Sequence, residues 1–138
     1  MRLKLIMLVS IFALGLAFNA NAGSVADADS DLVPDGFDNC SALANGPGQG
    51  SNQVDSDQDG YGNACDTDYN NDGATTTLDF PTFVDAFTGA VPNPATDHNG
   101  DGATTTLDFT PFLADFTGMN PPGPSGLGCA GGVPPCLP

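Results

Sequence analysis

Clusters of aspartates at alternating positions, most of them followed by Gly, are the residues of this sequence that could carry chemistry. All 17 acidic residues are Asp, and no Lys, Arg or Glu occurs after Lys4. Ca²⁺ is bound by several oxygen ligands on a tightly turning loop, and closely spaced aspartates supply such ligands. Without bound cations, a charge of one sign would drive the chain open by self-repulsion. The aspartates therefore predict a calcium-binding protein.

A segment that occurs twice carries the most specific metal-binding pattern, because Asp68 to Phe80 returns as Asp97 to Phe109. Helix-flanked calcium loops take ligands from positions 1, 3, 5, 7, 9 and 12, with Gly at position 6. The predicted ligands of the first copy are Asp68, Asn70, Asp72, the Ala74 carbonyl, Thr76 (directly or through water) and Asp79. Those of the second copy are Asp97, Asn99, Asp101, the Ala103 carbonyl, Thr105 and Asp108. The alternative is a pair of Asn/Asp-rich turns that bind no metal.

Each copy continues into apolar residues that are spaced like one face of a short helix. They are Phe80, Phe83, Val84 and Phe87, then Phe109, Phe112, Leu113 and Phe116. Pro81 and Pro111 suit the first helical turn, and Gly89 and Gly118 suit the C-terminal end. We expect two short helices whose apolar faces pack on each other.

The repeated segment, from Asp68 to about Met119, resembles dockerin modules, which carry two Asp-x-Asn-x-Asp-Gly loops, each closed by Asp and followed by a helix. The resemblance implies a calcium-bound, EF-hand-like pair (an F-hand pair) and attachment to a cohesin-like domain or a surface scaffold. In dockerins, loop positions 10 and 11 and basic helix residues help to contact cohesin. Here those positions hold Thr77-Leu78 and Thr106-Leu107, and the helices contain no basic residue.

Two further acidic groups precede the repeat, Asp27-x-Asp29-x-Asp31 and Asp55-x-Asp57-x-Asp59-Gly60. They resemble thrombospondin type 3 repeats, in which Asp-rich loops wrap calcium and a disulfide joins consecutive repeats. The resemblance implies ligands at Asp27, Asp29, Asp31, Asp35 and Asp38, and at Asp55, Asp57, Asp59, Tyr61, Asn63 and Asp66. Leu32 stands where Gly is usual, which predicts a strained turn or a weaker site. Asn63 stands where Asp is usual, so a neutral oxygen replaces a charge.

The alternative for this acidic segment is a disordered linker without metal. If all the loops bind, the sequence predicts about four calcium ions. The fold class expected is small and mainly α, a dockerin-like pair of loop–helix units preceded by irregular, calcium-wrapped loops.

The chain divides into four predicted parts. Residues 1–22 have a basic start, the apolar run Ile6 to Phe18 and an Ala20-Asn21-Ala22 cleavage site, which together indicate a signal peptide. Residues 23–66 form the thrombospondin-like loops and residues 67–119 the dockerin-like pair. Residues 120–138 form a Pro/Gly-rich tail, expected to be irregular and held at most by a small disulfide loop. We therefore expect a secreted protein, extracellular or at the cell surface.

Four cysteines in an exported chain predict disulfides. Three pairings are possible, and the spacing favours Cys40–Cys65 and Cys129–Cys136. The thrombospondin resemblance supports the first of these. Free or metal-bound thiols are the alternative, but a zinc site lacks the required cysteine spacing and has only one His available.

The composition also limits the function. With no cation to meet a phosphate, nucleic acid is not an expected partner, and membrane insertion is not expected because the one apolar run is short. The carboxylates are spaced as ligands rather than as an acid–base pair, so we expect no enzyme. Asp85, Asp115 and His98 are expected at the surface. Two interpretations remain, a calcium-folded module for protein attachment or adhesion, and a calcium-rigidified spacer or adhesin fragment without a dedicated partner.

Overall fold

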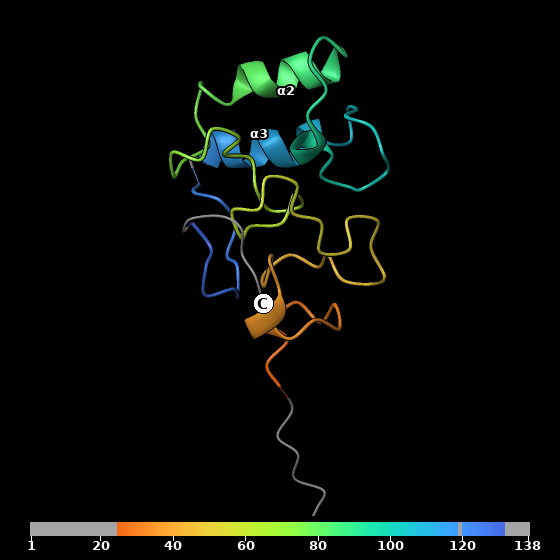
Figure 1. Ribbon diagram of the computed structural model, residues 1–138, viewed down its shortest axis with the longest axis vertical. Coiled ribbons are helices and arrows are strands. Elements are labelled where there is room, and N and C mark those ends of the chain that lie inside the picture. Colours follow the sequence, from red (N-terminus) through yellow and green to blue (C-terminus); the bar gives the residue numbers. More distant parts are fainter. Residues whose placement is uncertain (1–24, 119, 132–138) are drawn as a thin grey trace, which may run out of the picture.

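The computed structural model describes residues 25–118 and 120–131, so the predicted signal peptide and Cys136 lie outside the described residues. Its elements are η1 (Asp35–Phe37), α2 (Phe80–Phe87), η2 (Pro94–Thr96) and α3 (Phe109–Gly118), with no strand among them. The two α-helices lie one above the other at one end of an elongated molecule, and irregular loops form the other end (Figure 1). In the described part of the chain, no helix is long and apolar enough to span a membrane.

The helices form where the apolar periodicity predicts them. Pro81 lies in the first turn of α2, and Gly89 follows its C-terminal end with φ +73°. There the Gly89 N–H donates to the Ala86 carbonyl at 3.0 Å. A left-handed residue at this point ends a helix, and Gly adopts that conformation without steric cost.

The apolar faces of α2 and α3 pack on each other, as predicted. Phe83 and Phe112 are almost fully buried, and their ring centroids lie 5.3 Å apart. Phe109 packs against Phe83 at 5.6 Å, and Tyr69 stacks on Phe112 at 6.0 Å. This core is small, so apolar burial alone supplies limited stability.

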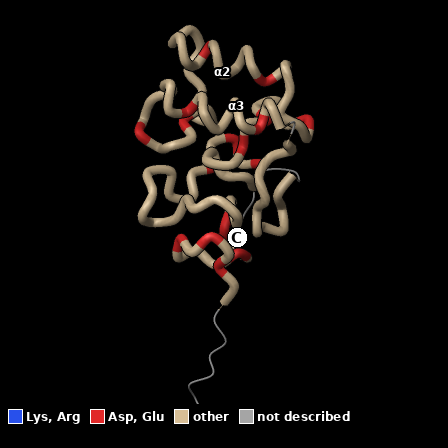
Figure 2. Tube along the Cα trace, turned by 180° about the vertical axis from the view of Figure 1, so that it is seen from behind, with Lys and Arg blue, Asp and Glu red and all other residues tan. Residues whose placement is uncertain are grey.

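Polar side chains outnumber apolar ones in the interior. Among the described residues, 15 polar or charged residues are buried, compared with seven apolar ones. Buried polar groups cost free energy unless they are hydrogen-bonded or bound to an ion. The fold therefore depends on a hydrogen-bond network and on whatever neutralises its aspartates, which lie in both halves of the molecule (Figure 2).

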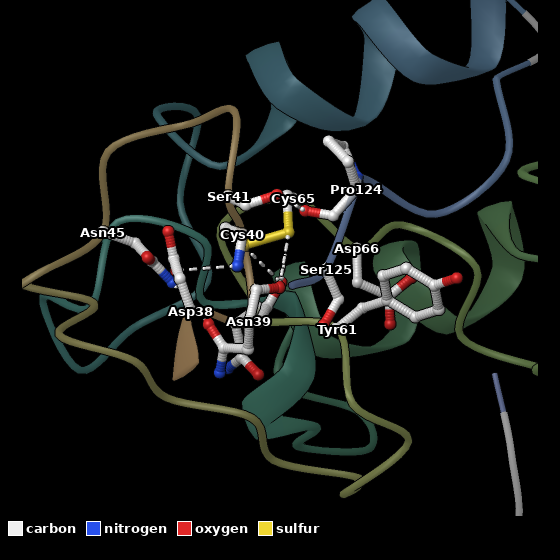
Figure 3. Close-up of a disulfide and its surroundings, with 12 residues drawn as sticks. Asp38, Asn39, Cys40, Ser41, Asn45, Tyr61, Cys65, Asp66, Pro124 and Ser125 are labelled. Carbon is white, nitrogen blue, oxygen red and sulfur yellow. Dashed lines mark hydrogen bonds between the residues drawn. A yellow bond between two sulfur atoms is a disulfide. The ribbon is translucent and has the colours of Figure 1, made fainter. Parts of the chain in front are cut away.

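The predicted disulfide Cys40–Cys65 is confirmed, with Cα atoms 5.8 Å apart. Together with Ala64, it forms the small apolar centre of residues 25–66, which we call the acidic half. Residues 67–118, which contain α2 and α3, are the helical half. Pro124 of the C-terminal tail lies beside it (Figure 3). The predicted Cys129–Cys136 bridge includes a residue outside the described part.

The tail is irregular, as predicted, but the expectation that only a disulfide loop would hold it is wrong. Its backbone N–H groups donate to carbonyls of the acidic half: Gly123 to Cys65 at 2.6 Å, Gly126 to Asp38 at 2.7 Å and Gly131 to Asp59 at 3.0 Å. A Cβ atom on Gly126 would lie 1.1 Å from the Asp35 carbonyl oxygen, so only Gly permits this approach.

Candidate metal centres

Four loops of the chain share one backbone conformation. We name them loop I (27–38), loop II (55–66), loop III (68–79) and loop IV (97–108). In every loop, the residues at positions 4 and 6 have left-handed φ angles. At position 4 the angles are 65° for Ser30, 66° for Gln58, 56° for Asn71 and 70° for Gly100. At position 6 they are 79° for Leu32, 98° for Gly60, 94° for Gly73 and 93° for Gly102.

The same two hydrogen bonds hold every loop. The position 1 carboxylate accepts the N–H of position 6, at 3.2 Å in loop I, 3.0 Å in II, 2.6 Å in III and 2.8 Å in IV. The position 5 carboxylate accepts the N–H of position 7, at 2.8, 2.8, 3.2 and 3.1 Å respectively. These bonds hold the first and fifth side chains on the inner side of the turn, where a cation would meet them.

At position 6, loop I differs from the other three loops. Leu32 has the left-handed conformation that Gly adopts in the other three loops, and its side chain is 81 % exposed. A left-handed L-residue costs about 1–2 kcal/mol, and exposure returns none of it. The strained turn predicted for loop I is therefore present.

Loops III and IV are closed in the same way by a buried aspartate at position 12. Asp79 accepts the Asn70 N–H at 3.2 Å and the Thr76 N–H at 2.7 Å. Asp108 accepts the equivalent N–H groups of Asn99 and Thr105 at the same two distances. Both aspartates are 0 % exposed, and burial raises the pKa of Asp79. The threonine hydroxyls at position 9 also donate to these carboxylates, so they position the closing ligand.

Loop I contains carboxylate oxygens that have no partner. The carboxylates of Asp27, Asp29 and Asp31 lie within 4.8 Å of one another. Asp38 is 0 % exposed, and Asp29 and Asp38 each have one buried oxygen, Oδ2, without a hydrogen bond. Burial and the nearby Asp31 and Asp38 raise the pKa of Asp29. Orphaned buried oxygens are rare, and a cation in the loop would satisfy both of them.

Loop II concentrates negative charge beside loop III. The carboxylates of Asp55, Asp57 and Asp59 lie within 4.8 Å of one another. Burial raises the pKa of Asp59 to about 6 and that of Asp66 to about 8, with smaller contributions from neighbouring aspartates that include Asp68. Burial favours the neutral acid in both cases, and a bound cation would favour the carboxylate.

The donors present fit calcium. Carboxylate, amide, hydroxyl and carbonyl oxygens are the hard ligands that Ca²⁺ prefers, and thiol or imidazole ligands would instead favour zinc or other transition metals. Asp35, at position 9 of loop I, turns back to accept the Ala28 N–H at 2.7 Å, which ties the end of that loop to its start.

Two polar residues, His98 and Asp115, have contacts that the sequence did not reveal. His98, expected at the surface, is 3 % exposed, so that expectation is wrong. Burial lowers its pKa, and its ring contacts Tyr69 and Asn63. Asp115 is partly buried and accepts the Thr67 hydroxyl at 3.0 Å, whereas Asp85 is exposed as predicted.

Asn63, a predicted ligand at position 9 of loop II, connects two segments in this structure. Its Oδ1 accepts the Ser56 N–H at 2.9 Å. Its Nδ2 donates to the Ser56 hydroxyl at 2.9 Å and to the Pro94 carbonyl at 2.8 Å. An aspartate could accept the Ser56 hydroxyl but could not bond to the Pro94 carbonyl, because an ionised carboxylate has no N–H to donate.

The comparison with protein families agrees with this loop geometry. Residues 26–47 and 54–80 match the thrombospondin type 3 repeat. That repeat is a calcium-binding module of extracellular proteins, and the Cys40–Cys65 disulfide joins the two matched segments. The match includes loops I, II and III, and loop IV, beyond it, has the same conformation. No curated protein and no solved structure matches the chain.

Proposed function

We propose that the chain is an exported calcium-binding protein whose fold is held together by about four Ca²⁺ ions, one in each loop. The observation that carries this proposal is the common conformation of the four loops, with left-handed residues at positions 4 and 6 and equivalent carboxylate hydrogen bonds. Each ion would cancel two of the negative charges that otherwise repel one another. Metal binding would then be coupled to folding, as in other small metal-stabilised domains.

We further propose that the chain attaches to another extracellular protein through an apolar groove beside α2. The groove has a volume of about 250 Å³ and is lined by Phe80, Phe83, Val84, Phe87, Thr106 and Phe109. Phe80 and Phe87 are 44 % and 45 % exposed. Exposed aromatic side chains that line a groove mark an interaction site more often than scattered apolar residues do.

Charge indicates the kind of partner. The chain has no Lys or Arg after Lys4, so a second copy would be repelled by its own charge. The partner proposed is therefore a cationic protein segment that places an apolar side chain in the groove. This differs from a cohesin-type contact that uses basic helix residues of the dockerin, and it involves no catalysis.

The second candidate function is a calcium-rigidified spacer without a dedicated partner. It is favoured by the irregular acidic half, where the tail, the disulfide and the loops hold one another. The two candidates make the same prediction for calcium and different predictions for attachment.

Two measurements test these proposals. Native mass spectrometry should count about four calcium ions on the chain; a chain that binds none would contradict the first proposal. For attachment, immobilised protein should retain an apolar, Lys/Arg-rich peptide in calcium and release it in chelator. Phe87→Ser should abolish this retention. Leu43→Ser, which changes an exposed leucine of the acidic half, is the matched control. Equal retention by both variants, or none by the wild type, would leave the spacer as the better interpretation.

A further inference from the structure

Loops II, III and IV meet at three residues, of which Asn63 and His98 are buried and Tyr69 is partly buried. Tyr69 and His98 occupy the same position, position 2, in loops III and IV, and Asn63 lies at position 9 of loop II. The Tyr69 hydroxyl lies 2.8 Å from His98 Nε2, and His98 Nδ1 contacts the Asn63 carbonyl oxygen. We call Tyr69, His98 and Asn63 the junction.

The chemistry of the three groups determines which of them donates and which accepts in each hydrogen bond of the junction. A carbonyl oxygen only accepts, so His98 Nδ1 must carry the proton that it shares with Asn63. In a neutral imidazole the other nitrogen is then an acceptor, and it receives the Tyr69 O–H. Each of the three groups therefore needs the others in place, because a misplaced partner would leave a buried donor or acceptor unsatisfied.

Further contacts tie the same loops together. Asn63 Nδ2 donates to the carbonyl of Pro94, in the η2 turn that leads into loop IV. Asn71 Nδ2 of loop III donates to the Asp57 carboxylate of loop II at 3.1 Å. The Tyr69 ring stacks on Phe112 of α3. Loop II is thus bonded to both loops of the helical half.

We propose that the junction couples calcium binding at loops II, III and IV, so that filling one loop raises the affinity of the other two. Ordering a loop around an ion places the residue at position 2 or 9, and that residue places its partners in the neighbouring loops. By linkage the effect is reciprocal, and such couplings change affinity about 5–150-fold. Tyr69, His98 and Asn63 are positioning residues in this proposal, which rests on the proposed function that the loops bind calcium.

The backbone amide of the glycine at position 6 provides a separate NMR signal for calcium binding in each of loops II, III and IV. The N–H groups of Gly60, Gly73 and Gly102 donate to the position 1 carboxylates of loops II, III and IV. A calcium titration of the ¹⁵N-labelled protein, followed by NMR, therefore measures the midpoint of each loop separately. In the wild-type chain we expect the three resonances to change together.

The decisive comparison uses two variants that each remove one hydroxyl. Tyr69→Phe removes only the junction hydroxyl and keeps the stacking ring, so the three midpoints should separate by about fivefold or more. Thr88→Val, which removes an exposed hydroxyl outside the four loops and the junction, is the control and should leave them together. As a second measure, Asp108→Ala should raise the Gly60 midpoint about fivefold or more in the wild-type background, and not in the Tyr69→Phe background.

The outcomes separate this proposal from the one on which it rests. Independent midpoints in the wild-type chain, or identical behaviour of Tyr69→Phe and Thr88→Val, would overturn the coupling while calcium binding stands. If none of the glycine resonances responds to calcium, the proposed function fails and the coupling fails with it. If the Asp108→Ala variant does not fold, the comparison of Tyr69→Phe with Thr88→Val still decides.

Discussion

The two halves of this molecule use similar loops in different settings. Loops III and IV are each followed by a helix, and their phenylalanines form a shared core around Phe83 and Phe112. Among the described residues of the acidic half, only the disulfide and Ala64 form a buried apolar cluster. Its remaining interior is polar, with Asp38 and Asn45 at 0 % exposure. The same loop conformation can therefore be supported either by apolar packing or by polar bonds and a covalent link.

Calcium removal should separate the halves most strongly. In chelator above pH 8, where its aspartates are charged, the acidic half should lose its amide protection completely, because charge repulsion there is opposed by little apolar burial. The helical half should keep part of its helix signal through the phenylalanine core. Hydrogen exchange with and without chelator, read beside circular dichroism, checks this. Equal loss of protection in both halves would mean that they fold as one unit.

Removal of the disulfide should be the next largest effect. The Cys40→Ser/Cys65→Ser double variant should destabilise the acidic half by about 2–4 kcal/mol, because a cross-link limits the unfolded chain. Denaturant titrations in calcium that follow the amide resonances of Gly60 and Gly102 separately should show the loss of stability at Gly60. A loss of the same size at both glycines would contradict a local role for the disulfide.

Removal of a closing aspartate should cost one ion. Asp79→Ala and Asp108→Ala should each lower the ion count by one in native mass spectrometry. At calcium a hundredfold above Kd, the lost ion corresponds to about 2.7 kcal/mol of stability. Asp85→Ala, which changes the exposed helix aspartate, serves as the control and should change neither quantity. An unchanged ion count in the two loop variants would remove these residues from the ligand set.

Stability should depend on pH in opposite directions with and without calcium. Asp59 and Asp66 have pKa values raised to about 6 and about 8, above the ordinary value of 3.8. In chelator the folded chain therefore holds protons that the unfolded chain releases, so the melting temperature should rise as pH falls from 8 towards 5. In calcium, protons compete with the ion for the carboxylates, so the same acidification should lower the melting temperature. Asp66→Asn should flatten the slope measured in chelator; an unaltered slope would argue against this assignment.

The strain in loop I predicts the smallest effect. Leu32→Gly should stabilise the calcium-bound protein by about 1 kcal/mol, because Gly removes the cost of the left-handed conformation and the exposed leucine loses no packing. The reciprocal change Gly60→Leu should destabilise loop II by a similar amount. Thermal unfolding curves of the two variants, recorded in calcium, compare the two changes in stability directly. A loss of stability in Leu32→Gly would show that Leu32 makes a contact that its exposure conceals.

Local features were predictable from the sequence and long-range contacts were not. The spacing of Asp68, Asp72 and Asp79 reveals a loop because all its parts lie within one short segment. The burial of His98 has no such signal, because position 2 of a calcium loop is ordinarily exposed and the groups that contact His98, the Asn63 carbonyl and Tyr69, are distant in the sequence. Asn63 itself could be noticed, since it replaces an expected Asp, but its bond to Pro94 could not be foreseen.

The sequence predicted the four acidic loops and the apolar faces of the two helices, and it favoured the Cys40–Cys65 pairing. Each of these depends on the order of a few neighbouring residues or on a small number of cysteines. Only the folded structure shows how the tail returns to the carbonyls of Cys65, Asp38 and Asp59, and how loops II, III and IV meet. Those contacts join irregular polar segments, whose hydrogen bonds follow no periodic pattern and depend on where each backbone group comes to lie in space.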